Sequence, residues 1–176
     1  MLNDQNHIKI FENIQLSLQH DSSYLEAHKQ LILFYFNIQK EMECREAIGV
    51  FVAKVKEMEQ EQSDELAEID ISLFKTIVRI MIEGEIWEDG AYLMDLAVGY
   101  NKLDLEAGYL HAFCLFNAQK DIEAMDICED LKERGILKYD DEELVIGFKE
   151  LYKAVSDSVA DKEPEDEDWE DESDEE

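Results

Sequence analysis

The chain has 176 residues, a hydrophobic fraction of 45% and a formal net charge of −29 at pH 7. This length and apolar content suit one domain with a core of its own, and one proline with seven glycines are too few for the turns of a strand-rich fold. So negative a charge repels nucleic acid and anionic lipid. We therefore expect an all-helical protein that binds neither membranes nor DNA or RNA directly.

The negative charge is concentrated near the carboxyl end of the chain. Residues 161–176 hold 12 acids and one lysine, which leaves 33 acids and 15 bases, a charge of −18, for residues 1–160. Both parts attract cationic protein segments. Because the body is already acidic, an acidic tail that served only solubility would be redundant, so we expect the tail to capture or shield a basic protein.

The cysteines and the amino terminus indicate the compartment. Cys44, Cys114 and Cys128 form an odd set without Cys-x-x-Cys spacing, which is typical of buried thiols in a reducing compartment. The first residues lack the basic and apolar regions of a leader, and the longest wholly apolar run, Leu31 to Phe36, is too short to span a bilayer. We expect a cytoplasmic and nuclear protein without a membrane anchor.

The first helix is predicted from Ile8, Phe11, Ile14 and Leu18, which recur at helical spacing. The pattern stops at residues 20–23, where an aspartate and two serines (Asp21, Ser22, Ser23) are candidate caps of the next helix. Since this helix precedes a hairpin, we expect the chain to begin in the second half of a repeat. On this interpretation it is either the carboxy-terminal part of an ancestrally longer array or a shortened chain.

A first helical hairpin is predicted over about residues 24–55. Its first helix, 24–39, buries Ala27, Leu31, Phe34, Tyr35 and Ile38; the turn lies near 40–43, and the partner helix begins at Cys44. The acidic residues 56–70 break the period that follows, and we interpret them as a lengthened helix and loop.

Two more hairpins follow at a fixed spacing. Helices are predicted over 71–82 and 86–98, and again on both sides of a polar break at 117–121 within Leu105 to Leu131. Residues at equivalent places in the two hairpins recur 34 positions apart: Val78 corresponds to Ala112, and Gly90 corresponds to Ala124. Small side chains there let the two helices of a hairpin approach closely.

A last helix is predicted after Asp140, with Glu143 as the capping-box acid. Its apolar stripe contains Leu144, Phe148, Leu151, Tyr152 and Val155. This helix should cover the open end of the stack, with Phe148 and Leu151 buried against residues 124–131. We place the helical domain at residues 1–156 and a disordered acidic tail at 157–176.

Residues with catalytic or binding chemistry are scarce. The chain has no Gly-rich phosphate loop, His-Glu-x-x-His, Gly-x-Ser-x-Gly or EF-hand motif, so we expect no enzyme, no catalytic or metal site and no cofactor. His111 and Cys114 lie one helical turn apart, but two ligands do not make a metal site. Ser173, among acids, is a possible phosphorylation site.

Two stretches carry a family pattern: Leu25-Glu26-Ala27 followed by Leu31 and Tyr35, and Tyr109-Leu110-His111-Ala112-Phe113 followed by Lys120-Asp121-Ile122-Glu123-Ala124. Over about residues 24–131 they resemble the tetratricopeptide (TPR) family, which has a 34-residue helix-turn-helix repeat. The cap helix running into Asp166-Glu167-Asp168-Trp169-Glu170-Asp171 looks like the fungal family of dedicated assembly chaperones of large-subunit ribosomal protein four. That resemblance implies capture of a newly made, highly basic ribosomal protein for ribosome assembly and its escort into the nucleus.

The family register implies a client-binding groove along the first helix of each hairpin. Its candidate residues are Glu26, Lys29, Leu33, Phe36, Ser72, Lys75, Arg79, Ile82, Glu106, Tyr109, Phe113 and Phe116. One alternative is an adaptor or co-chaperone that binds acidic carboxyl termini through groove lysines. Another is a scaffold subunit of a protein complex.

Overall fold

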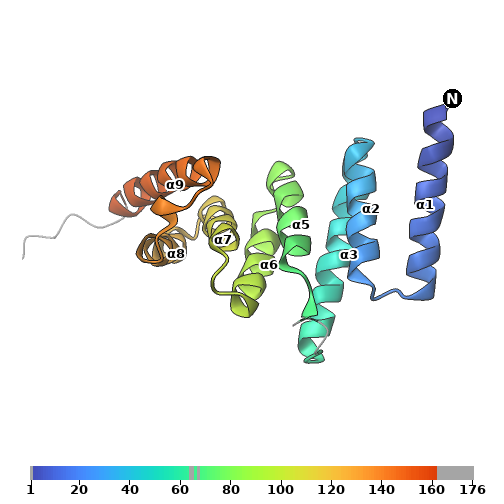
Figure 1. The fold of residues 1–176 in the computed structure, drawn as a ribbon, viewed down its shortest axis with the longest axis horizontal. Helices are drawn as coiled ribbons and strands as arrows, with labels where there is room; N and C mark the ends of the chain where they lie inside the picture. The colour runs from blue at the N-terminus through green and yellow to red at the C-terminus, as the bar shows by residue number, and fades with distance from the viewer. Residues whose placement is uncertain (1, 64–65, 67, 162–176) are drawn as a thin grey trace, which may run out of the picture.

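The computed structural model describes residues 2–63, 66 and 68–161, and all regular structure among them is helical, without any strand. The prediction of an all-helical protein is thus confirmed for this part of the chain. Figure 1 shows the helices arranged side by side in an elongated array, with α1 at one end and α9 at the other. The helices are α1 (Leu2–His20), α2 (Leu25–Asn37), α3 (Glu41–Gln60), α5 (Ile71–Glu83), α6 (Trp87–Tyr100), α7 (Leu105–Asn117), α8 (Asp121–Glu133), the 3-10 helix η1 (Ile136–Lys138) and α9 (Glu142–Ala160).

Consecutive helices pair into hairpins: α2 with α3, α5 with α6, and α7 with α8. The second and third hairpins keep one spacing, because α7 begins at Leu105, 34 residues after α5 begins at Ile71, and α8 follows α6 at the same distance. The first and second hairpins are 46 residues apart, from Leu25 to Ile71. A longer α3 and the segment before α5 account for the additional residues, as the acidic stretch predicted.

The three hairpin turns share one backbone geometry. Each first helix is followed by a left-handed residue, at Gln39, Glu85 and Gln119, with φ between 56° and 64°. In the last turn the amide of Gln119 donates to the carbonyl of Phe116 and that of Lys120 to the carbonyl of Leu115, both at 3.0 Å. The other two turns repeat these bonds, which define a Schellman motif.

Small residues lie where the two helices of a hairpin meet. Ala112 on α7 and Ala124 on α8 are both fully buried. One repeat earlier, a Cβ added to Gly90 on α6 would lie 3.0 Å from Cys114 Sγ and 3.8 Å from Val78 Cγ1. Close helix packing therefore requires a small side chain at Gly90.

Helix α9 covers the end of the array by packing on α7 and α8. Phe148 and Leu151 are buried, at 1% and 5% exposure, which confirms the predicted burial of the end cap. The helix continues to Ala160, four residues past the domain boundary placed at 156. The expected acidic tail from residue 162 onwards lies outside the described residues.

Two predicted helix caps are wrong. The N-cap of α9 is Asp141, whose carboxylate accepts from the amide of Leu144, so Asp140 and Glu143 do not form a capping box. The N-cap of α2 is Tyr24, without a side-chain cap. Asp21 instead accepts hydrogen bonds from the amide and hydroxyl of Ser23, and the carbonyl of Ser22 bonds His28, so these polar groups are used within the turn.

Candidate functional site

The twelve candidate groove residues lie on α2, α5 and α7, four on each helix. These helices are neighbours in space, α2 beside α5 and α5 beside α7. The candidates stand at corresponding positions once the 46- and 34-residue offsets are applied. The corresponding sets are Glu26, Ser72 and Glu106; Lys29, Lys75 and Tyr109; Leu33, Arg79 and Phe113; and Phe36, Ile82 and Phe116.

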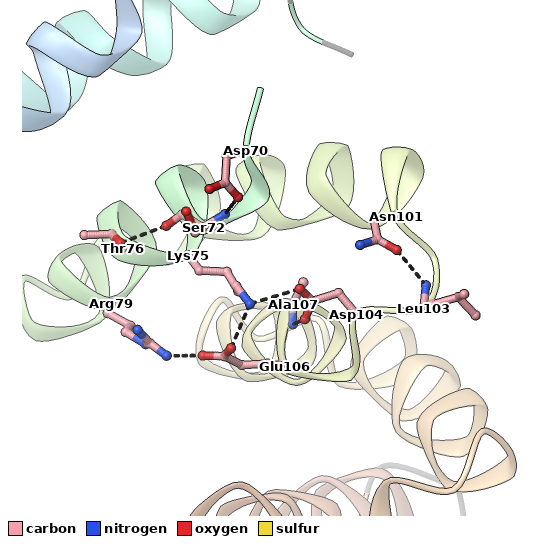
Figure 2. A network of polar contacts seen from close by, with 10 residues as sticks. All are labelled: Asp70, Ser72, Lys75, Thr76, Arg79, Asn101, Leu103, Asp104, Glu106 and Ala107. Atoms are coloured by element: carbon pink, nitrogen blue, oxygen red, sulfur yellow. Dashed lines mark hydrogen bonds and ion pairs between the residues drawn. The ribbon is translucent and has the colours of Figure 1, made fainter. Parts of the chain in front are cut away.

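Ion pairs occupy the middle of this surface (Figure 2). Lys75 Nζ lies 2.9 Å from a carboxylate oxygen of Asp104 and 2.8 Å from one of Glu106, and Arg79 pairs with the other oxygen of Glu106. On α2, Lys29 Nζ lies 2.8 Å from Glu26. Every Lys or Arg of α2, α5 and α7 is therefore already paired with a carboxylate of the same chain.

Local helix chemistry places these charges. Asp104 is the N-cap of α7 and accepts from the amide of Ala107 at 2.9 Å, so its second oxygen is held towards Lys75. The Lys75 side chain is only 17% exposed. Its burial favours the neutral amine, but the bonds to Glu106 and Asp104 outweigh this and raise the pKa of Lys75.

Asp104 is a member of this network that sequence reasoning missed. Its signal was present, since an aspartate directly precedes the apolar stretch that begins at Leu105. Asp70 holds the same place before α5, where it accepts from the amide of Ser72 at 2.9 Å. Hydrogen bonds from the hydroxyl and the amide of Ser72 lower the pKa of Asp70, and Lys75 and Lys29 add smaller contributions.

Aromatic side chains fill the α7 end of the surface. Phe113 lies between the rings of Trp87 and Tyr109, with both centroid distances 6.1 Å. Phe113, Tyr109 and Phe116 are partly buried against the core. The Tyr109 hydroxyl lies close to α9, because a Cβ added to Gly147 would be 2.8 Å from it. Tyr109 is therefore partly covered by the end helix, and Phe113 belongs both to the surface and to the helix packing beneath it.

The α2 end of the surface opens into a cavity of about 510 Å³ between the first and second hairpins. Phe36, which is 36% exposed, lines this cavity together with Cys44, Ile48 and Ile80. Leu33 and Ile82 are partly buried against the core. Apolar side chains thus lie on both sides of the central ion pairs.

The charge divides between the two sets of hairpin helices. The first helices, α2, α5 and α7, contain three acids and three bases and are neutral. The second helices, α3, α6 and α8, contain fourteen acids and four bases, a net charge of −10. The acidic surface of the body therefore belongs mainly to the second helices, above all α6 and α8.

The remaining candidate residues are His111, Cys114 and Ser173. His111 and Cys114 are both buried on α7, and burial raises the pKa of the Cys114 thiol to about 12. No group of three or more possible metal ligands occurs among the described residues, and none of the helices there is long and apolar enough to cross a membrane. Ser173 lies outside the described residues.

The chain matches no known protein family, no curated protein and no solved structure.

Proposed function

We propose that this chain is a TPR-like helical-repeat chaperone that captures a newly made basic protein, with a large-subunit ribosomal protein as its client during ribosome assembly. The 34-residue offset between the last two hairpins and the same Schellman turn in all three support the repeat architecture. The ribosomal client follows from the resemblance of the cap helix and acidic tail to the assembly-chaperone family.

The observation that carries the proposal is the division of charge. The first helices are neutral, with apolar side chains on both sides of internal ion pairs, while the second helices carry a net charge of −10. An extended client segment can bury its apolar side chains on the first helices while its lysines and arginines meet the acids around them. Newly made basic proteins present such segments before they assemble.

The pairing of the lysines argues against the adaptor alternative. Binding an acidic carboxyl terminus requires cations that are free to meet its carboxylates. Lys29 and Lys75 already pair with Glu26 and with Asp104 and Glu106. A scaffold subunit with a neutral partner would show binding that does not depend on salt, whereas a basic client binds more weakly as salt rises.

The test measures both affinity and stability of Phe113→Ala. Affinity purification of the full chain with mass spectrometry identifies the client, and titration with that client gives the dissociation constant. A buried aromatic anchor is commonly worth about 2 kcal/mol, so the variant should bind at least about tenfold more weakly. Leu103→Ala is the control, because Leu103 is 86% exposed on the loop between α6 and α7 and lies off the proposed surface.

The melting temperature separates the two roles of Phe113. If Phe113 acts mainly in the core, its truncation lowers thermal stability strongly. The proposed client-binding groove is contradicted if the affinity is unchanged, or if affinity is lost only under conditions in which the variant is already unfolded. A co-purified client that is acidic or neutral contradicts the proposed function as a whole.

A further inference from the structure

Ser158 lies in the last turn of α9, two residues before the helix ends at Ala160. Its hydroxyl donates a hydrogen bond to a carboxylate oxygen of Asp121, the first residue of α8. Asp121 is 5% exposed, and Ser158 is half-buried. This pair, which we call the α8–α9 clasp, joins the far end of the cap helix to the last hairpin.

A second polar contact joins the middle of α9 to the carboxyl-terminal half of α8. Tyr152 of α9 donates to Glu129 of α8 at 2.5 Å, and Lys132 lies 2.7 Å from the Tyr152 hydroxyl. The α8–α9 clasp is thus the outer of two polar contacts, placed where the end of α9 frays most readily. Fraying there would expose Ser158 without opening the rest of the interface.

The sequence after Ser158 is that of an acid-directed kinase substrate. Asp161 stands three residues on, and residues 161–168 contain six acids, one lysine and one proline, with no serine or threonine. Such kinases recognise acids that follow the target serine through their basic clefts. We propose that Ser158 is a phosphorylation site whose modification opens the α8–α9 clasp. This inference does not depend on the proposed function.

In the reaction, Ser158 Oγ attacks the γ-phosphorus of ATP and forms the new P–O bond. The bond from that phosphorus to the β–γ bridging oxygen breaks, ADP leaves, and the hydroxyl proton passes to the base of the kinase.

Phosphorylation changes the clasp from attractive to repulsive. It removes the hydroxyl donor and places a charge of about −2 beside the carboxylate of Asp121. The amino-terminal end of α8 attracts anions through the helix dipole, but the positive charge of that end is only about half an elementary charge. The full charge of Asp121 lies closer, so repulsion dominates and the last turn of α9 separates from α8.

The test begins with the full chain carrying Ser173→Ala, treated with an acid-directed serine/threonine kinase and MgATP. Mass spectrometry should find phosphate on Ser158, and the modified protein should melt at a lower temperature. Ser158→Glu should lower the melting temperature by about 4 °C or more relative to Ser158→Ala, which removes only the hydrogen bond. Asp121→Asn in the Ser158→Glu background should restore most of that loss, because it removes the opposing charge.

Ser156→Glu is the matched control. Ser156 lies in the same part of α9, and its hydroxyl makes no hydrogen bond to another described residue, so this variant should melt within about 1 °C of the unmodified chain. Absence of phosphate on Ser158, equal stability of the glutamate and alanine variants, or failure of Asp121→Asn to rescue would each overturn the proposal.

Discussion

His111 is 9% exposed within α7, and burial of its imidazole lowers the pKa below the ordinary value of 6.5. The carboxylates of Asp95 and Glu123 favour the charged form, and Lys120 opposes it, but burial dominates. Between the lowered folded-state pKa and 6.5, the unfolded chain therefore binds the proton more readily. The stability that His111 contributes is complete above 6.5 and is lost as the pH falls through that window.

His111→Gln should consequently lose less stability than the natural chain between about pH 7 and about pH 5.5. Denaturant unfolding at several pH values measures this difference. His20→Gln serves as the control for replacing a histidine, because His20 is exposed at the end of α1. Equal slopes for His111→Gln and the natural chain would show that His111 is not responsible for the acid sensitivity.

At the scale of the elements, each hairpin turn places a residue with a side chain in the left-handed region. Glycine adopts this conformation at no steric cost, whereas other residues lose about 1 kcal/mol. Gln119→Gly, at φ 64°, should therefore raise the free energy of unfolding by up to about 1 kcal/mol.

Ala118→Gly tests the same turn in the opposite sense. Ala118 precedes Gln119 at φ −80°, where glycine brings only greater freedom to the unfolded chain, so this change should destabilise by about 0.5–1 kcal/mol. Denaturant unfolding of the two variants gives both values. If both changes lower stability, the left-handed residue is not a source of strain.

The sequence predicted the helices well because their apolar residues recur with a strong helical period. The bounds of α5, Ile71–Glu83, differ from the predicted 71–82 by one residue. The cap of α9 was mispredicted because Asp140 and Asp141 are chemically equivalent in sequence, and backbone geometry selects between them. The cap of α2 was mispredicted because Asp21 bonds Ser23 within the turn, which leaves Tyr24 as the N-cap. The ion pair between Lys75 and Asp104 was also missed, since it joins residues of adjacent hairpins whose relative placement depends on packing.

At the scale of the whole molecule, each hairpin contacts mainly its neighbours along the array. Such an arrangement leaves a long surface open on the first helices and collects the acids of the second helices in another layer. Side-chain contacts between hairpins reinforce this arrangement, for example the bond from Tyr92 on α6 to Glu59 on α3. Both sets of helices contribute to the core, but the net negative charge of the hairpins lies on the second helices.

If the chain binds a basic client as proposed, electrostatic attraction should govern how fast the client arrives, and packed contacts should govern how long it stays. Removing residues 161–176, which hold 12 of the acids, keeps α9 intact because that helix ends at Ala160. The association rate with the client should fall at low salt, and the difference should shrink as salt rises, since screening at 0.1 M acts over about 10 Å. Stopped-flow measurement at several ionic strengths gives both rates.

A second variant keeps the full length but has every Asp and Glu of residues 161–176 replaced by Asn and Gln. It separates the effect of the segment's charge from the effect of the segment's presence. If charge is responsible, this variant should associate as slowly as the truncated one while dissociating at the natural rate. Association as fast as that of the natural chain would mean that the acids of the segment do not steer the client. A changed dissociation rate would instead make the segment part of the packed contact, with the first helices supplying only the remainder of the affinity.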